Sequence, residues 1–273
     1  MKSRLFITVL VAHMTVPAFA GSIFVTGHDP IWHANQGVNT VGARNLAVTG
    51  IQFARNGSPL PFLFIESKTD PIPSGNLREA PFLTSALGYS AASFQVMDAA
   101  DLLALGSNFR TTLDSYSAIV VASDHGGMLS ADELLFLNGH ALDIIDYLNA
   151  GGGLFAAAES NARGMIGATP RFGFLPFLVS SADFQTAETA NVVTPFGLGL
   201  GLVNGDVNGN FSHNYFASTG GMNPVDLFNG MANRPLTLAF RGPITPTGVP
   251  EPGTIFLLGA ALVALSAARK RRG

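Results

Sequence analysis

The chain has 273 residues, with 15 Lys or Arg against 18 Asp or Glu and no cysteine. The lack of cysteine excludes disulfides, thiolate metal sites and cysteine nucleophiles. Apolar residues make up 47% of the chain, which is enough material for a buried core, while 31 glycines and 16 prolines indicate many turns. This length suits one large domain or two small ones.

The first twenty residues have the three parts of a secretory signal peptide. Lys2 and Arg4 give a basic start, residues 5–12 are apolar, and Ala18 and Ala20 form an A-x-A cleavage site. The alternative is a buried first strand or helix. We expect export through the Sec translocon, with cleavage directly after the A-x-A site.

The mature region begins with short apolar runs that alternate with helical patterns. The predicted strands cover 23–26, 61–66 and 93–97, and the predicted helices cover 37–55 and 77–87. The first of these helices carries Val38, Val41, Leu46 and Ile51.

The clearest unit is a strand, a helix and a second strand between 116 and 160. Residues 118–122 are apolar without alternation, which is typical of a strand covered on both faces. Ser130 and Glu133 form a capping box that opens a helix with one apolar stripe from 134 to 148, and a strand over 154–158 follows. This order predicts a parallel crossover. It therefore predicts a flavodoxin-like, three-layer α/β fold, in which helices cover both faces of a mostly parallel sheet.

Beyond residue 176 the pattern loosens. Glycine and asparagine are frequent, so we expect long loops with short strands and then a linker over 241–248. Asp206 begins a run that resembles a calcium loop, but Phe211 stands where glycine is required and Ala217 where glutamate is required. The run therefore fails as an EF-hand and is expected to be an asparagine-rich turn.

The end of the chain has three parts in order. Pro250, Glu251 and Pro252 precede an uncharged run, 253–268, and four basic residues follow at 269–272. The run is predicted to be a membrane helix, because flanking basic side chains can extend its span to the interface. It covers roughly 24 Å as a helix, against about 30 Å of bilayer hydrocarbon.

This ending closely resembles the PEP-CTERM sorting signal of Gram-negative bacteria. The resemblance implies recognition by an exosortase, processing near Pro250, Glu251 and Pro252, and transient anchoring through the membrane helix. The implied destination is the cell surface or the extracellular space, often alongside exopolysaccharide production. The predicted organisation is a signal peptide over 1–20, an α/β domain over 21–240, the linker, and the sorting signal over 249–273.

Removal of both terminal segments changes the charge of the protein. Between Gly21 and Pro252 there are 9 Lys or Arg and 18 Asp or Glu, a net charge of −9. Such a surface repels nucleic acid, so a nucleic-acid partner is not expected.

Residues 22–180 also resemble the class I glutamine-amidotransferase-like fold. The matching features are the turn 124–127, which reads Asp-His-Gly-Gly, and the approach 149–159 to the next turn. The family's nucleophilic cysteine would follow that second strand, where this chain has Glu159-Ser160-Asn161. Glutaminase chemistry is therefore excluded.

Polar residues follow three of the predicted parallel strands, whose carboxyl ends should meet at one edge of the sheet. The catalytic candidates are His28, Asp29, Asp124, His125 and Glu159. The candidates for a metal are His28, His33 and His125, since imidazoles with carboxylates suit divalent ions. No resident cofactor is predicted beyond such a metal. The alternative is structural, because residues near strand ends often form turns and caps without any ligand.

Three functions fit these observations. The first is an exported, surface-sorted protein without catalysis that binds a matrix component such as an exopolysaccharide. The second is a hydrolase-like enzyme of the amidotransferase-like superfamily that uses the His/Asp site. The third is a purely structural matrix protein, which predicts no concave polar pocket.

The sorting signal gives a direct prediction. We expect the Glu251→Ala variant to stay in the inner membrane with its tail uncut, because the acid between two prolines is the most distinctive part of the signal. Cell fractionation and the size of the protein on an immunoblot would measure this. An Asp114→Ala control, which loses one carboxylate elsewhere, should be processed normally, and normal release of Glu251→Ala would contradict the prediction.

Overall fold

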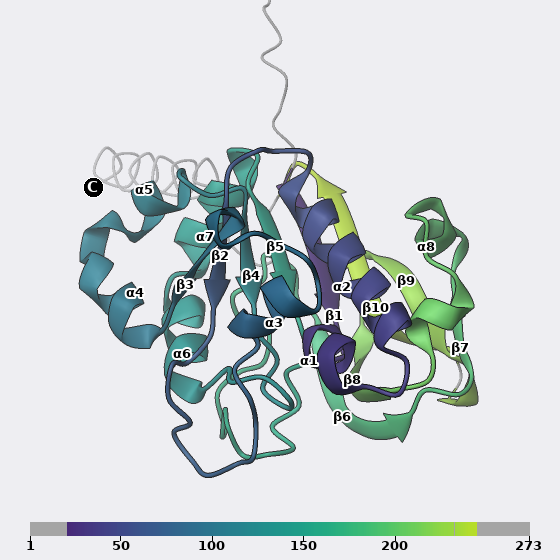
Figure 1. Cartoon of the computed structure of the whole chain (residues 1–273). Coiled ribbons are helices and arrows are strands. Elements are labelled where there is room, and N and C mark those ends of the chain that lie inside the picture. The colour runs from purple at the N-terminus through teal and green to yellow at the C-terminus, as the bar shows by residue number, and fades with distance from the viewer. Residues whose placement is uncertain (1–20, 232, 245–273) are drawn as a thin grey trace, which may run out of the picture.

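The computed structural model describes residues 21–231 and 233–244, so the predicted signal peptide, the sorting signal and the membrane helix over 253–268 lie outside the described residues. An eight-stranded sheet runs through the domain in the order β3-β2-β4-β5-β1-β10-β9-β7 (Figure 1). Its first five strands are parallel, and its last three are antiparallel. The prediction of an α/β fold with a large, mostly parallel sheet is confirmed, while the finer likeness to the amidotransferase-like fold stays a prediction.

The parallel strands are β1 (Gly21–Thr26), β2 (Phe62–Ile65), β3 (Phe94–Met97), β4 (Ala118–Val121) and β5 (Gly153–Ala156). Every residue of β1, β2, β4 and β5 is buried. Because successive side chains on a strand point to opposite faces, both faces of this part of the sheet are covered. Unbroken apolar runs therefore identified these strands correctly.

Helices cover the parallel strands. They are α1 (Pro30–Gln36), α2 (Thr40–Arg55), α3 (Ala80–Ser85), α4 (Ala99–Leu105), α5 (Phe109–Leu113), α6 (Ala131–Gly139) and α7 (Ala141–Asn149). Short 3₁₀ turns, η1 (Ala91–Ser93) and η2 (Gly106–Asn108), precede β3 and follow α4. Helix α2 lies in front of β1 in Figure 1, and it buries Leu46 and Ile51. Val38, which precedes α2, and Val41 are 92% and 69% exposed.

The stretch from Ser130 to Asn149 is two helices where one was predicted. The capping box of Ser130 and Glu133 is present at the start of α6. The helix then ends at Gly139, and the backbone of His140 leaves the helical region at φ −107° and ψ 23° before α7 begins. Glycine next to the break favours such an ending, because it weakens a helix interior.

The second half is more regular than its composition suggests, and the prediction of short strands there is wrong for β6, β8 and β10, which have 8, 8 and 9 residues. It contains β6 (Ser180–Ala187), β7 (Asn191–Val193), β8 (Phe211–Ser218), β9 (Asn223–Phe228) and β10 (Arg234–Gly242), with α8 (Pro195–Gly199), η3 (Asn204–Val207) and η4 (Asn229–Met231). Strand β10 pairs with β1 and extends the sheet, while β6 and β8 form a separate antiparallel pair. The predicted linker began at 241, but β10 includes Arg241 and Gly242.

The run that resembles a calcium loop is a hydrogen-bonded turn. Asn39, the N-cap of α2, donates from Nδ2 to the carbonyl oxygens of Gly205 and Asn208 at 2.6 and 2.7 Å. Asn45 donates to Asp206 Oδ1 at 2.9 Å. These contacts join the turn to α2, which agrees with the rejection of an EF-hand.

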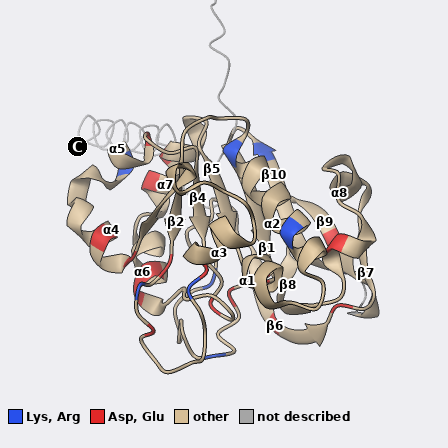
Figure 2. Cartoon of the chain, in the orientation of Figure 1, with Lys and Arg blue, Asp and Glu red and all other residues tan. Residues whose placement is uncertain are grey.

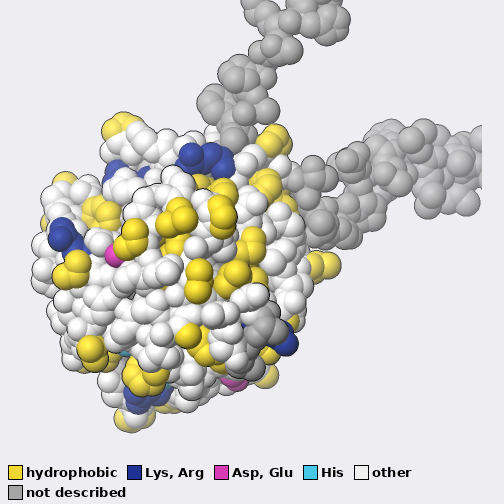
Figure 3. Space-filling model, turned by 90° about the vertical axis from the view of Figure 1, so that its right-hand side faces the viewer, with side chains coloured by type: hydrophobic (Ala, Val, Ile, Leu, Met, Phe, Trp, Pro, Cys, Tyr) yellow, Lys and Arg dark blue, Asp and Glu magenta, His cyan; other side chains and the backbone are white. Residues whose placement is uncertain are grey.

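The surface is sparsely charged. In Figure 2, acidic segments gather below α3 and beside α1, at the carboxyl ends of the parallel strands. The face that carries β7 and α8 shows scattered hydrophobic side chains among polar ones (Figure 3); exposed members on these elements are Val192 and Leu198. Within 21–231 and 233–244, no helix is both long and apolar enough to cross a membrane.

Gly50 sets how closely α2 can approach the sheet. A Cβ atom there would lie 2.6 Å from the Phe155 ring and 2.7 Å from the Phe24 ring. We expect Gly50→Ala to lower the free energy of unfolding by about 1–3 kcal/mol, because the added methyl group would overpack the core. Urea denaturation would measure the change.

Gly139→Ala is the matched control for this substitution. Gly139 is also helical, and a Cβ atom there would meet nothing within 4 Å. This variant should be neutral, or more stable by up to about 1 kcal/mol, because alanine favours the helix. Equal effects of the two substitutions would contradict the packing argument.

Candidate functional site

The carboxyl ends of β1, β4 and β5 meet at one edge of the sheet, as predicted. The loop after β1 carries His28 and Asp29, the loop after β4 carries Asp124 and His125, and Glu159 follows β5. His125 is partly exposed, and the other four are at most 2% exposed. Their hydrogen bonds divide these residues into two groups, one structural and one with unused ligand atoms.

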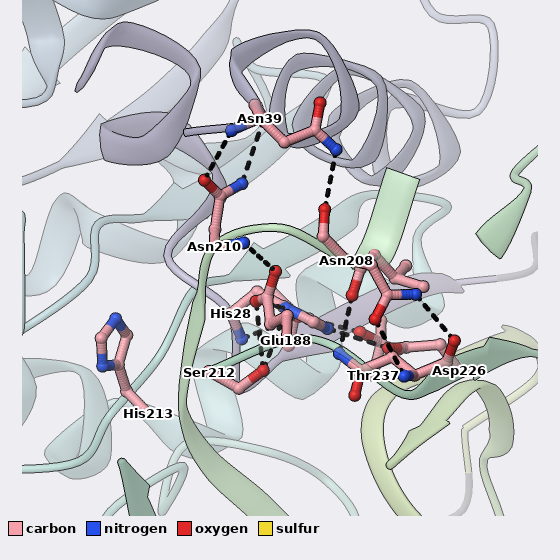
Figure 4. Close-up of polar contacts among 12 residues, drawn as sticks. His28, Asn39, Glu188, Asn208, Asn210, Ser212, His213, Asp226 and Thr237 are labelled. Atoms are coloured by element: carbon pink, nitrogen blue, oxygen red, sulfur yellow. Dashed lines mark hydrogen bonds and ion pairs between the residues drawn. The ribbon is translucent and has the colours of Figure 1, made fainter. Parts of the chain in front are cut away.

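His28 belongs to a buried ion cluster (Figure 4). Its Nδ1 lies 2.5 Å from Glu188 Oε1, and its Nε2 lies 2.9 Å from Asp226 Oδ2. Burial opposes charge on the ring, but Asp226 and Glu188 outweigh it and raise the pKa of His28 to about 10. His28 is therefore a cation at neutral pH, with both nitrogens engaged, and has no lone pair for a metal.

The same cluster resembles a Ser-His-Asp triad in its contacts. Ser212 Oγ lies 3.3 Å from His28 Nδ1, and it donates to Glu188 Oε1 at 3.1 Å. A triad needs an accessible hydroxyl and a histidine that can take its proton. Ser212 is fully buried, and His28 is already protonated. The cluster is structural: it joins β1 to β8, β9 and the end of β6.

Asp124 and Glu159 also have structural roles. Asp124 Oδ1 accepts from the Ser160 backbone N–H at 2.8 Å and Oδ2 from that of Asn161 at 2.5 Å. Burial raises the pKa of Asp124 to about 6, although these two hydrogen bonds act to lower it. Glu159 Oε2 accepts from the Phe172 N–H at 2.5 Å, and burial raises the pKa of Glu159 well above its usual range. Both carboxyls hold loops in place.

Asp29, His125 and His213 form the second group. One ligand atom from each lies within 4.8 Å of the others. The rings of His125 and His213 are stacked, with centroids 3.7 Å apart and planes at 17°. His213 was not among the predicted site residues, because its segment was predicted to be a loop. It lies on β8, outside the polar network drawn in Figure 4.

Glycines allow this group to assemble. A Cβ atom on Gly27 would lie 1.8 Å from the Asn214 carbonyl oxygen, so only glycine lets β8 come against the end of β1. A Cβ atom on Gly126 would lie 2.0 Å from Asp29 Oδ2. The glycine that follows His125 therefore leaves room for the carboxylate of Asp29.

The ligand atoms of the group are largely unused by the protein. Neither oxygen of Asp29 accepts a hydrogen bond from an N–H group among the described residues. His213 Nδ1 lies 2.8 Å from Gln185 Oε1, which can only accept, so Nδ1 carries the proton and Nε2 keeps its lone pair. That Nε2 is buried and has no partner in the described part of the chain.

Electrostatics keep both histidines neutral. Burial, followed by repulsion from the neighbouring basic groups His125, His33, His28 and Arg163, lowers the pKa of His213 well below its usual range. Burial also lowers the pKa of His125, although the Asp29 charge opposes this. Neutral imidazole is the form that binds metal ions.

Glu79 supports Asp29 from behind. Its carboxyl oxygens accept backbone N–H groups of Trp32 and Ser123, each at 3.1 Å. Burial and the Asp29 charge raise the pKa of Glu79 well above its usual range. In its neutral form, Glu79 donates a hydrogen bond to Asp29 and holds that carboxylate in place.

The group opens into a pocket of about 250 Å³. Its lining includes Trp32, His33, Asn76, Arg163, Gln185 and Phe211, besides His125 and His213. His33 stacks on His213 at 6.0 Å, and neither of its ring nitrogens has a partner among the described residues. A wider groove of about 610 Å³ lies between α4 and α6, but it shares no lining residue with this pocket and contains none of the three ligands.

The buried ion cluster gives a stability prediction. We expect Glu188→Gln to lower the free energy of unfolding by about 3–5 kcal/mol, because the buried His28 cation would lose one of its two carboxylate partners. The matched control is Asp143→Asn, in an ion pair with His140 whose side chains are 32% and 39% exposed. That change should cost about 1 kcal/mol or less. Denaturant melts of the two variants would measure the difference, and similar losses would contradict the account.

Comparison with known families identifies the end of the chain. Residues 248–272 match the PEP-CTERM protein-sorting motif. A comparison with curated proteins found no significant match to the chain. The matched segment supports export, exosortase recognition and membrane-anchored sorting to the surface. The chain is therefore an exported protein that carries a PEP-CTERM sorting motif.

Proposed function

We propose that this surface-sorted protein binds a divalent transition-metal ion through Asp29, His125 and His213 and uses it to hydrolyse a small substrate. The observation that carries the proposal is the convergence of three ligand atoms from three separate segments, within 4.8 Å of one another. Two of these ligands, Asp29 and His213, have buried atoms that no N–H group among the described residues satisfies. Buried polar atoms without partners are costly, and a bound ion would satisfy them.

The ligand set favours a catalytic ion over a structural one. Imidazole suits zinc, iron, copper and nickel, and two imidazoles with one carboxylate are typical of sites that keep an open position. Structural zinc sites usually have four protein ligands. Here the two histidines of the group line a pocket, so the open coordination position would face that pocket. An ion would draw the three ligand atoms closer together and tilt the stacked rings.

When bound, such an ion lowers the pKa of a coordinated water to about 7 and polarises a carbonyl or phosphoryl oxygen. The protein's own residues prepare the site. Gln185 fixes the tautomer of His213, and Glu79 orients Asp29, as partners of ligands commonly do. His33 has unused ring nitrogens in the same pocket and can hold or move a proton there. The predicted amidotransferase-like fold would also place catalysis at this edge.

Binding without catalysis is the second candidate, with a saccharide component of the matrix as the ligand. Two aromatic side chains support this candidate. Trp32 and Phe211 both line the pocket, and Phe211 is 50% exposed. Such side chains offer apolar faces beside polar groups. A purely structural matrix protein is disfavoured, because that hypothesis predicted no concave polar pocket.

Metal binding tests the proposal. The mature protein, stripped with a chelator and then dialysed against Zn²⁺ or Co²⁺, should retain one ion per chain by elemental analysis. His125→Ala and His213→Ala should each weaken binding by at least about 100-fold, since loss of a partner behind a ligand already costs 10–100-fold. The visible spectrum of bound Co²⁺ should change in the same variants.

The control is His140→Ala, which removes a histidine far from the pocket and should leave metal content unchanged. Circular dichroism would show that the variants are folded. A wild-type protein that retains no metal, or equal retention in all variants, would contradict the proposal.

A further inference from the structure

Arg163 is a cation in the pocket without a carboxylate partner. Its side chain is exposed, and Nη1 donates to the Ser74 carbonyl oxygen at 3.0 Å. No acidic side chain forms an ion pair with it within the described residues. Four of its five N–H groups are therefore available, and a guanidinium matches the two oxygens of a carboxylate.

The position of Arg163 is set by its loop. Asn161 has a left-handed backbone, with φ 56°, and its Oδ1 accepts the N–H groups of Ile166 and Gly167 at 3.1 and 2.8 Å. The bond to Ser74 joins this loop to the one before Asn76. The guanidinium is thus hydrogen-bonded to the loop that supplies Asn76, and both residues line the pocket.

Asn76 presents an acceptor to the same pocket. Its Nδ2 donates to the carbonyl oxygens of Asp124 and Gly127 at 3.0 and 2.7 Å, which fixes the orientation of the amide. Its Oδ1 is buried and has no partner in the described part of the chain, and the residue is 8% exposed. A hydroxyl of a ligand would satisfy this oxygen.

These features specify one class of ligand. The guanidinium requires an anion, Asn76 Oδ1 requires a hydroxyl, and Trp32 provides a flat wall. A pocket of about 250 Å³ is smaller than a typical drug-sized site and suits a single sugar ring. We propose that Arg163 selects a carboxylated monosaccharide unit, with the carboxylate on the guanidinium and a hydroxyl on Asn76. This inference extends the proposed function, because the ligand would lie beside the metal group.

The domain as a whole repels anions, since the mature region carries a net charge of −9. Selectivity for a carboxylate must therefore come from local groups. A metal ion on Asp29 and the two neutral histidines would add positive charge next to Arg163. The metal-loaded protein should accordingly bind the anion more tightly than the metal-free protein.

Glucuronate and glucose are suitable probes, because they share a ring and differ in one carboxylate. Isothermal titration of the mature protein, metal-free and loaded with Zn²⁺, should show at least a 10-fold preference of the loaded form for glucuronate over glucose. Arg163→Gln should remove that preference, since a charge-assisted hydrogen bond contributes roughly this much. Its Zn²⁺ content should be unchanged.

The matched control is Arg44→Gln, which removes an exposed arginine outside this pocket and should keep the preference. A preference that survives in Arg163→Gln would overturn the inference, and so would tighter binding of glucose 6-phosphate than of glucuronate. If the protein retains no Zn²⁺ but still shows an Arg163-dependent preference, the proposed metal function fails and this inference stands. If Zn²⁺ binds without any such preference, this inference alone fails.

Discussion

The structure depends on one buried contact between the two halves of the chain. His28, at the end of the first strand, is held as a cation between Glu188 and Asp226, which come from the antiparallel half. Gly27, directly before it, allows the backbone at Asn214 to come into contact. Together they fix β8 against the end of β1, and β8 delivers His213 to the edge where Asp29 and His125 lie. A buried ion pair adds little net stability compared with apolar packing, but it demands a defined geometry. Here that geometry positions the candidate site.

The polar residues at this edge of the sheet form two groups. They differ in whether other protein groups use their hydrogen-bonding atoms. Asp124 and His28 are fully engaged with backbone N–H groups or opposite charges, so they maintain the loops. Glu159 accepts the Phe172 N–H through Oε2, and its Oε1 has no partner among the described residues. Asp29 and His213 are equally buried, yet each keeps ligand atoms that the protein does not use. Glu79 and Gln185 stand behind them and set their orientation. This contrast within a few residues argues for a ligand at the second group.

The sequence was informative where the signal is local. Unbroken apolar runs identified the parallel strands, and their shared edge placed Asp29 and His125 together without any structure. The roles of the histidines were not predictable, because the partners of His28 lie 160 and 198 residues away. His213 was missed for a related reason: its strand pairs with β6 through register shifts that composition does not encode. The terminal sorting signal needs no tertiary contact to be recognised, so it could be read directly.

The central claim is that Asp29, His125 and His213 hold one metal ion. Anomalous X-ray diffraction from crystals grown with Zn²⁺, recorded at the zinc edge, tests it most directly. The account predicts one strong peak at about 2.0–2.2 Å from an Asp29 oxygen and from a ring nitrogen of each histidine. Zinc bound only elsewhere, for example at the half-buried His140, or a water molecule alone between the three side chains would contradict it.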